Sequence, residues 1–368
     1  MNVAIIGAGS IGNHLAYSAR KVGWNLSVFD RDLVALERFR NDIYPNRYGS
    51  FDSGISLYDM NQFMDSKAEL FDAVLIGTPP DTHLEIVKHA VKLQPKIIFI
   101  EKPLCPPSEE EIFEIREIIH SKQDIQFLCG YNHRLNSVTR NLLDSFELLD
   151  TSANRLEVNW LESWDGIMQA HPWIKSPSDT YLGFTRRGGG ALFEHSHGID
   201  LWIKLAQNLG LGIPRRVKTK FKEVRDEKTG DSYDSEVDIE IETNLGFVGR
   251  VTQDVISFPS VKQVKLEGNL YHFRAHYNHG GFDKLLCSPK SKTLGGFNLE
   301  ISKPRPSDFD TEITLIDRLL KGVKIKNQRL GLDATSGLFT AFVAKKALDS
   351  AKLNDSEEIE MAGWNLSD

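Results

Sequence analysis

The sequence predicts an α/β fold with an N-terminal doubly wound domain over residues 1–125 and a C-terminal α+β domain, with an open, largely antiparallel sheet, over residues 126–368. In the first part, short apolar runs alternate with helical segments, which is typical of a parallel sheet covered on both faces. From about residue 153, apolar and polar residues alternate strictly, which is typical of strands with one buried and one wet face. A chain of 368 residues, 40% of them hydrophobic, has enough apolar material for two cores.

The elements of the first domain follow from local pattern. Short apolar or β-branched runs predict strands, and apolar residues at helical spacing predict helices. Ser108 and Glu111 form a capping box at the start of the last of these helices. The expected strands are Val3–Ile6, Leu26–Phe29, Ala73–Ile76 and Ile97–Ile100, and the expected helices are Ile11–Val22, Leu33–Phe39, His83–Val91 and Ile112–Ile119.

The second domain shows strand alternation and turn signals. Gly246 and the pair Gly268-Asn269 predict the turns of antiparallel hairpins. Apolar residues at helical spacing predict a core helix over about 331–352, which is expected to pack back on the first domain. Val237, Ile239 and Ile241 alternate with an acidic row, which is expected to be a solvated sheet face or, alternatively, a subunit contact; this row is Glu236, Asp238, Glu240 and Glu242.

Composition excludes several classes of partner. The chain has 44 Lys and Arg against 51 Asp and Glu, a net charge of −7, which disfavours binding to duplex nucleic acid. Its three cysteines lack C-x-x-C spacing, so neither a disulfide framework nor a cysteine zinc site is expected. The first residues show no signal-peptide pattern and the apolar stretches are short for a membrane span. We therefore expect a soluble cytoplasmic protein.

A G-x-G-x-x-G pattern follows the first predicted strand. In this context Gly7 permits the tight turn, Gly9 the close approach of a pyrophosphate and Gly12 close helix packing. The first turn of the helix, with Ser10 and Ile11, presents free N–H groups to the phosphates. The pattern predicts a dinucleotide site.

The end of the second predicted strand indicates which dinucleotide binds. Asp30 lies eighteen residues after Gly12, where an acid accepts hydrogen bonds from both ribose hydroxyls of NAD and repels a 2′-phosphate. Arg31 alongside would instead favour that phosphate. NAD is the expected cofactor, with NADP as the alternative.

Two further motifs follow strands at the carboxyl edge of the sheet, where open α/β folds bind ligands. Thr78-Pro79-Pro80-Asp81-Thr82-His83 follows the third predicted strand, although its prolines are equally consistent with a simple strand end. Glu101-Lys102-Pro103 ends the next strand, where the lysine would point into the crevice. The cofactor-site candidates here are Thr78, Pro79, Pro80, His83, Glu101 and Lys102.

The segment from Arg187 to Asp200 carries three glycines followed by acids and histidines. The glycines would let the backbone approach a ligand closely. On one continuous helix Glu194, His197 and Asp200 would share a face. We interpret them as a relay in which Asp200 or Glu194 orients the imidazole and His197 exchanges a proton.

These four motifs, in this order and at this spacing, resemble the glucose-fructose oxidoreductase, inositol dehydrogenase and rhizopine-catabolism (Gfo/Idh/MocA) family. The resemblance implies a Rossmann domain and an open α/β domain whose sheet supports a homodimer or homotetramer. It also implies NAD(P)-dependent oxidation of a secondary alcohol, or reduction of a ketone, in a sugar, inositol or sugar nucleotide.

The resemblance assigns roles residue by residue. Lys102 matches the family lysine at the reacting hydroxyl, and His197 matches the proton acceptor. Glu194 departs from the family pattern, because the usual acid is an aspartate four residues before the histidine. The Glu-x-Ser-His version is similar to branches associated with bacterial surface sugars. Substrate contacts are expected from Asn132, Arg134, Arg187, Glu194 and His197, with linker structure as the alternative for Asn132 and Arg134 and a solvated position as the alternative for Arg187. A polar loop with His171, Trp173 and Lys175 is expected to line the cleft.

Other functions remain open on the sequence alone. The same residues suit a glycosidase that oxidises its sugar transiently, or a protein that senses NAD without turnover. A catalytic metal is not expected. His195 and His197 are close in sequence, but the histidines of a second cluster do not share one face of a strand. That cluster comprises His272, His276 and His279.

Overall fold

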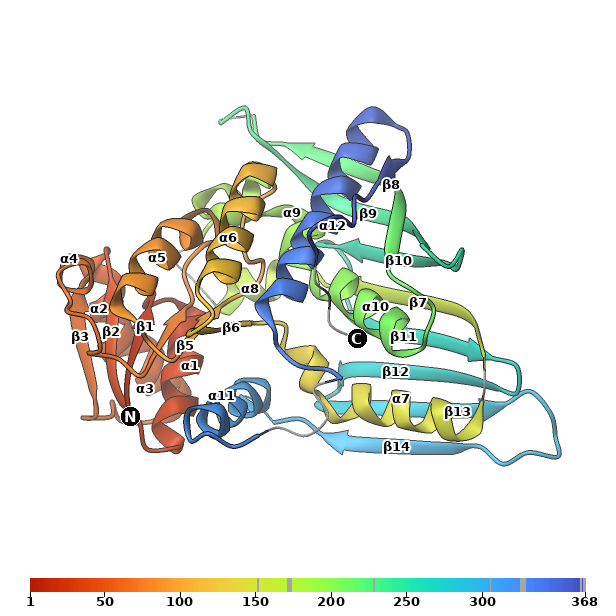
Figure 1. Cartoon of the computed structure of the whole chain (residues 1–368), viewed down its shortest axis with the longest axis horizontal. Helices are drawn as coiled ribbons and strands as arrows, with labels where there is room; N and C mark the ends of the chain where they lie inside the picture. The colour runs from red at the N-terminus through yellow and green to blue at the C-terminus, as the bar shows by residue number, and fades with distance from the viewer. Residues whose placement is uncertain are drawn as a thin grey trace.

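The computed structural model describes residues 1–150, 152–170, 174–227, 229–304, 306–324, 329–364 and 366. Two sheets organise the chain, a parallel sheet A near the N-terminus and a larger, mostly antiparallel sheet B (Figure 1). The predicted fold class is therefore confirmed. His171 and Trp173 lie outside the described residues.

Sheet A has six parallel strands in the order β3-β2-β1-β4-β5-β6. The order reverses between β1 and β4, and in doubly wound sheets the ligand crevice lies at this reversal. Strands β4 and β5 are buried along their whole length, as their continuous apolar sequence predicts. The strands are β1 (Asn2–Ile6), β2 (Asn25–Asp30), β3 (Ile55–Asp59), β4 (Ala73–Ile76), β5 (Ile97–Ile100) and β6 (Gln126–Cys129).

Helical segments connect the strands of sheet A. Ser108 caps α6 by accepting a hydrogen bond from the backbone N–H of Glu111, as predicted. The helix expected after β2 continues through a π-helical turn, η1 (Phe39–Ile43), into a further helix. These segments are α1 (Ser10–Lys21), α2 (Leu33–Arg38), α3 (Tyr44–Tyr48), α4 (Met60–Met64), η2 (Pro80–Thr82), α5 (His83–Ala90), η3 (Val91–Leu93) and α6 (Glu109–Ser121).

Strands β3 and β6 were not predicted from the sequence. β3 is an edge strand that is buried only at Ile55, so it lacks the continuous apolar run of its neighbours. β6 pairs with β5 and ends at Cys129, four residues beyond the boundary expected at residue 125. The division into domains remains a prediction, and this pairing favours a boundary after Cys129.

Sheet B has nine strands in the order β14-β13-β12-β11-β7-β10-β9-β8-β15. The hairpins predicted at Gly246 and at Gly268-Asn269 join β9 to β10 and β11 to β12. Among the described neighbouring strands of sheet B, only β7 and β10 run parallel to each other. The strands are β7 (Ala153–Leu161), β8 (Pro214–Arg225), β9 (Ser232–Thr243), β10 (Val248–Asp254), β11 (Val261–Gly268), β12 (Tyr271–His279), β13 (Phe282–Pro289), β14 (Phe297–Ser302) and β15 (Glu357–Glu358).

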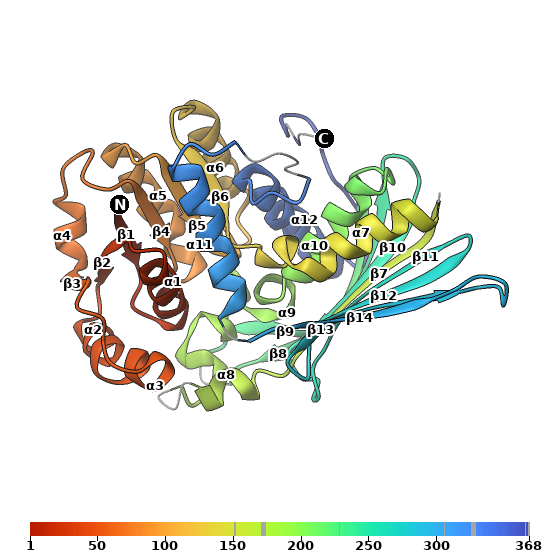
Figure 2. The same cartoon turned by 90° about the horizontal axis from the view of Figure 1, so that it is seen from below.

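Helices α7 (Ser137–Leu149) and α10 (His197–Asn208) cover one face of sheet B, and no described helix covers the other (Figure 2). The acidic row of β9 lies on the uncovered face. Cross-strand ion pairs join Lys222 to Glu236 at 2.9 Å and Arg250 to Asp238 at 3.0 Å. The row is thus balanced by the basic residues of β8 and β10.

Two C-terminal helices contact the region of sheet A. α12 (Ala334–Leu353) packs against α6, where the rings of Phe342 and Phe113 lie 5.7 Å apart. α11 (Ser307–Leu320) packs along α1, and the Trp24 indole donates to Asp317 at 3.1 Å. None of the helices in the described ranges combines the length and apolar character needed to cross a membrane.

Candidate active site

The glycine-rich loop between β1 and α1 has the geometry of a dinucleotide cradle. Gly7 has φ of 108°, and a Cβ there would lie 2.9 Å from the Gly77 carbonyl oxygen. A Cβ on Gly12 would lie 1.9 Å from the Gly7 carbonyl oxygen, whereas a Cβ on Gly9 would meet no atom within 4 Å. Gly7 and Gly12 are therefore required by protein packing, and the open space at Gly9 fits the approach of a pyrophosphate.

Asp30 at the end of β2 is fixed by the same loop. Its carboxylate accepts a hydrogen bond from the backbone N–H of Ala8 at 2.7 Å and another from that of Asp32 at 2.8 Å. A carboxylate has about four acceptor positions, so capacity remains for ribose hydroxyls. Arg31 is exposed beside it. These residues fit NAD, and a 2′-phosphate would lie against the Asp30 charge.

Arg47 is a cation at this loop that the sequence analysis missed. Its guanidinium donates to the Ser10 hydroxyl at 2.9 Å and to the Ser10 carbonyl at 3.3 Å, where α1 begins. Ile11 follows in the same turn and lies beneath Gly77. Arg47 comes from α3, far along the chain from the glycine motif, and no motif marks it.

The Thr78-Pro79-Pro80 loop lies at the carboxyl edge of sheet A, after β4. His83 is fully buried behind it, with its ring nitrogens at the carbonyl oxygens of Thr78, 2.8 Å away, and Leu104, 3.1 Å away. Burial lowers the pKa of His83. We predicted a cofactor contact for His83, but the structure instead places it as a link between two loops.

Lys102 and Glu194 meet at the end of β5. The Lys102 ammonium donates to the Glu194 carbonyl oxygen at 2.8 Å and to Glu194 Oε1 at 3.0 Å. The Tyr181 hydroxyl donates to the other carboxylate oxygen at 2.6 Å. Both side chains of the ion pair are more than four-fifths buried, at 14% and 12% exposure. The longer glutamate therefore reaches the lysine despite its shifted position in the motif.

A second carboxyl lies behind Lys102. Glu101 is buried and accepts only the backbone N–H of Lys102, at 3.1 Å, and its Oε1 has no hydrogen-bond partner. Burial raises the pKa of Glu101 to about 7. Glu312 from α11 is fully buried nearby, and burial together with the Glu101 charge raises its pKa well above the usual range. Asn132, predicted to bind substrate, is buried beside Glu312.

His197 is the first residue of α10 and is enclosed by aromatic rings. The ring centroids of His133, Trp160 and Tyr131 lie 4.6, 5.6 and 5.7 Å from that of His197. Its Nδ1 is buried and has no hydrogen-bond partner. Burial, followed by the charges of Lys102 and Lys262, lowers the pKa of His197 well below its usual value. The imidazole is therefore neutral and able to accept a proton.

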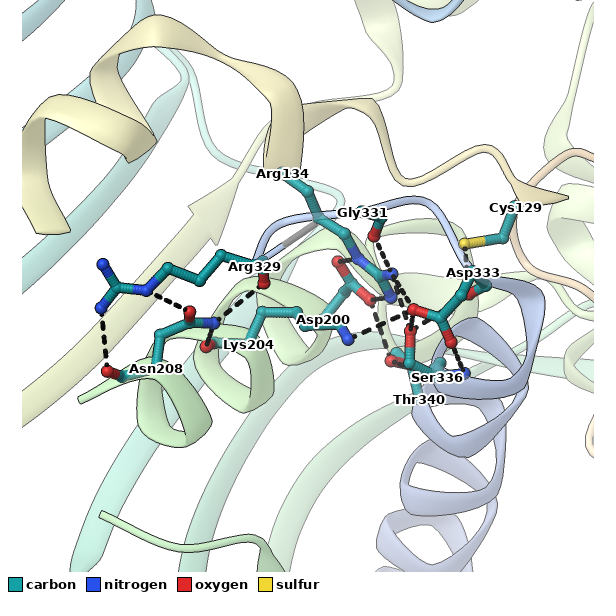
Figure 3. A network of polar contacts seen from close by, with 10 residues as sticks. All are labelled: Cys129, Arg134, Asp200, Lys204, Asn208, Arg329, Gly331, Asp333, Ser336 and Thr340. Carbon is teal, nitrogen blue, oxygen red and sulfur yellow. Dashed lines mark hydrogen bonds and ion pairs between the residues drawn. The ribbon is translucent and has the colours of Figure 1, made fainter. Parts of the chain in front are cut away.

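The relay expected from Glu194, His197 and Asp200 is wrong. Helix α9 (Gly190–Glu194) ends before His197, so these residues do not lie on one continuous helix. Asp200 instead pairs with the buried Arg134, and Thr340 donates to Asp200 at 2.9 Å (Figure 3). Glu194 bonds to Lys102 and Tyr181. Neither acid orients the imidazole.

Arg134 has a different role from the substrate contact we predicted. It is fully buried, donates through Nε to Asp200 at 2.8 Å, and donates to the Gly331 carbonyl at 2.9 Å and to Ser336 at 2.8 Å. These partners lie on α10 and at the start of α12 (Figure 3). Arg134 therefore joins its own segment to α10 and to the chain around the start of α12.

Arg187 and the glycines after it make close contacts with other parts of the chain. Arg187 donates to Asp81 at 2.6 Å, which ties it to the loop after β4. Gly188 has φ of 90°, and a Cβ there would lie 3.0 Å from Pro80. A Cβ on Gly190 would lie 2.2 Å from Asp234. Gly188 thus allows close packing against the loop after β4, and Gly190 allows close packing against β9.

The sequence analysis missed the residues that surround His197. His133, Trp160, Lys262 and Lys303 come from four separate segments, and Lys262 Nζ lies 5.5 Å from the Trp160 ring. Trp160 alternates inward on β7, a weak signal that predicts burial only. Within the described ranges, no group of three or more His, Cys, Asp or Glu side chains is arranged to hold a metal ion.

The arrangement combines a neutral imidazole and a lysine at the carboxyl edge of a dinucleotide cradle. A neutral imidazole accepts a proton, and an ammonium stabilises negative charge on an oxygen. Both functions are needed when a hydroxyl loses its proton as hydride leaves its carbon. The chain's own residues thus match the requirements of alcohol oxidation.

The N-terminal part of the chain matches a known family model. Residues 1–131 match the family model GFO_IDH_MocA, described as an oxidoreductase family with an NAD-binding Rossmann fold. This match confirms the resemblance predicted from the four motifs. No curated protein sequence matches the chain.

Solved structures share the fold over nearly the whole chain. An oxidoreductase domain protein from Kribbella flavida is 14% identical with a TM-score of 0.75, covering 97% of this chain and 98% of that one. Levoglucosan dehydrogenase in complex with NADH and levoglucosan is 16% identical with a TM-score of 0.74, covering 98% and 99%. The WlbA dehydrogenase from Chromobacterium violaceum, in complex with NADH and UDP-GlcNAcA, is 14% identical with a TM-score of 0.70, covering 98% and 96%.

Proposed function

Because residues 1–131 belong to the NAD-binding Rossmann part of the Gfo/Idh/MocA oxidoreductase family, we propose that the chain is an NAD-dependent dehydrogenase or reductase. It would transfer hydride between the nicotinamide and a secondary alcohol or ketone of a sugar, inositol or sugar nucleotide. The observation that carries this proposal is the placement of Lys102, held by Glu194, near the neutral imidazole of His197.

Each group has a role in the proposed reaction. Bound NAD would supply the hydride acceptor, held by the glycine-rich loop and Asp30. Lys102 would donate a hydrogen bond to the reacting oxygen, and Glu194 fixes the direction of its ammonium. His197 would accept the hydroxyl proton, because its environment keeps the imidazole neutral.

Two neighbours guide the choice of substrate. Their structures hold levoglucosan, an anhydrosugar, and UDP-GlcNAcA, a sugar nucleotide. Together with the Glu-x-Ser-His variant, the second supports a sugar of surface-carbohydrate metabolism as one candidate. The uncovered face of sheet B supports a homodimer or homotetramer, which light scattering of the purified chain tests.

A substrate panel tests the proposed activity. The purified chain is incubated with NAD and neutral sugars, inositols or uridine-linked sugars, and NADH is followed by absorbance. We expect NADH with at least one class, a loss of activity in Lys102→Met, and unchanged activity in the exposed control Lys220→Met. Release of an aglycone without NADH would instead identify a glycosidase, and NAD binding with neither product would identify a sensor.

A further inference from the structure

A large cavity of about 1140 Å³ lies apart from Lys102 and His197. It is bounded by α7, α11, the C-terminal half of α10, β6 and the segment over residues 329–333. Its volume is slightly above the usual range of about 300–1,000 Å³ for small-molecule sites. Apolar side chains form much of its wall, among them Phe127, Leu143, Leu319 and Leu332.

Cations line this cavity without matching acids. Arg140, Arg318 and Lys324 face it, and none of them has a carboxylate within 4 Å in the described part of the chain. Of the acids in the wall, Asp310 pairs with Lys21 at 2.6 Å. Asp144 is exposed on α7. In a chain of net charge −7, the wall carries an excess of positive charge.

Lys204 on α10 is the most buried of these cations. Its side chain is 9% exposed, and its ammonium makes one contact, with Asp333 Oδ2 at 3.5 Å. An ammonium has three N–H donors, and donors left unfilled inside a protein cost free energy. The other wall acid, Asp333, already accepts from the Ser336 hydroxyl at 2.7 Å and from its backbone N–H at 2.8 Å. Lys204 therefore keeps N–H donors that no acceptor in the described part of the chain fills, at the wall of the cavity.

Lys204 also adjoins the network around Arg134. Asp333 Oδ2 lies 3.8 Å from Arg134 Nη1, and Arg134 pairs with Asp200 one turn before Lys204 on α10 (Figure 3). The network fixes the position of the Lys204 backbone through Asp200. Its ammonium is thus held at the cavity wall by a rigid element.

We propose that this cavity binds a small organic phosphate monoester. The phosphate would accept hydrogen bonds from Lys204 and Arg318, and an apolar or aromatic body would lie against the leucines of α7 and α11. A phosphate ester is chosen over a carboxylate because its charge of about −2 matches several unpaired cations. Nothing in the proposed dehydrogenase reaction uses this site.

Phenyl phosphate is a suitable probe, because it combines a phosphate with an aromatic ring. Calorimetric titrations of the full chain, with and without saturating NAD, distinguish the cavity from the phosphate-binding loop at Gly9. We expect saturable binding that persists with NAD and weakens at least about 10-fold in Lys204→Met and in Arg318→Gln. Lys220→Met is the matched control and should bind like the wild type.

Three outcomes would overturn the proposal. They are the absence of saturable binding up to about 10 mM probe, unchanged affinity in Arg318→Gln, and equal affinity for phenol. Arg318 is exposed, so its variant remains informative if Lys204→Met fails to fold. The readout does not depend on turnover, so failure of the dehydrogenase proposal leaves this test intact.

Discussion

Two polar residues one turn apart in helix α10 differ in how their hydrogen bonds are satisfied. At its start, His197 is enclosed by aromatic rings and its Nδ1 has no partner. One turn later, Asp200 is 1% exposed and is bonded to Arg134 and Thr340. The same helix thus carries an unsatisfied group toward the cofactor loops and a saturated ion pair toward α12.

This contrast separates groups that do chemistry from groups that hold the fold. Buried polar groups are nearly always hydrogen-bonded, so one that is not requires an explanation. Perturbed and unpartnered titratable groups concentrate at functional sites. On this criterion we expect His197 to take part in the proposed reaction, whereas Asp200 and Arg134 hold parts of the fold together.

The largest effect on stability is expected from breaking the ion pair between Arg134 and Asp200. Arg134→Met leaves the Asp200 carboxylate buried with Thr340 alone, which should lower the free energy of unfolding by about 3–5 kcal/mol. Denaturant unfolding measures this loss. The control is Arg155→Met, which breaks an exposed pair with Glu157 and should cost about 0–1 kcal/mol. Equal losses of stability in the two variants would show that the buried pair contributes no more to the fold than the exposed pair.

His197→Ala should lower turnover by about 100-fold or more, because the proposed proton acceptor is lost. NAD binding, followed by fluorescence titration, should persist. His195→Ala is the matched control, since the ring of His195 faces the Glu162 carbonyl at 3.3 Å. Unchanged turnover in His197→Ala would exclude it from the mechanism.

Asp30 tests the cofactor side of the site. Asp30→Ala should weaken NAD binding by about 10–100-fold, because charge-assisted hydrogen bonds to the ribose are lost. The variant should also have a smaller preference for NAD over NADP, because the Asp30 charge no longer repels the 2′-phosphate. Parallel titrations with the two dinucleotides measure both effects. A variant that keeps its preference would show that Asp30 does not select the cofactor.

For Asp234 we expect a change in the pH dependence of stability rather than in turnover or cofactor binding. It is buried, accepts the backbone N–H of Leu192 at 2.6 Å, and burial raises its pKa from 3.8 to about 7. Folding therefore favours the protonated form, so its contribution to stability is full below about pH 4 and is lost as the pH rises to about 7.

Unfolding measured across this pH range tests the effect. Asp234→Asn should reduce the fall in stability by at most about 1.4 kcal/mol per pH unit. Glu101 and Glu312 contribute in the same direction, so a residual slope is expected. A slope that is identical in the variant would show that Asp234 stays ionised.

The glycine-rich loop and Asp30 were predictable because their geometry is local. Gly12 packs against the Gly7 carbonyl within one turn, Gly9 leaves open space beside it, and Asp30 bonds to the same loop. Their spacing in the sequence therefore contains most of the information. The same is true of the alternating strands of sheet B.

Side-chain partnerships between distant elements were not predictable. Arg134 and Asp200 are separated by 66 residues, and no spacing rule states which pairs will meet. The break between α9 and α10 displaced Glu194 from the helical face that periodicity predicted. Glu312 carries no motif, because its burial depends on how α11 packs against the N-terminal region.

The two hydrogen bonds from Lys102 to Glu194 have a stereochemical consequence. An ammonium has three N–H bonds, and the carbonyl and Oε1 of Glu194 accept two of them. One direction remains from which a substrate oxygen can accept. In the proposed reaction that single direction would limit where the reacting oxygen can lie, and so the orientations in which the carbinol carbon could face a bound nicotinamide.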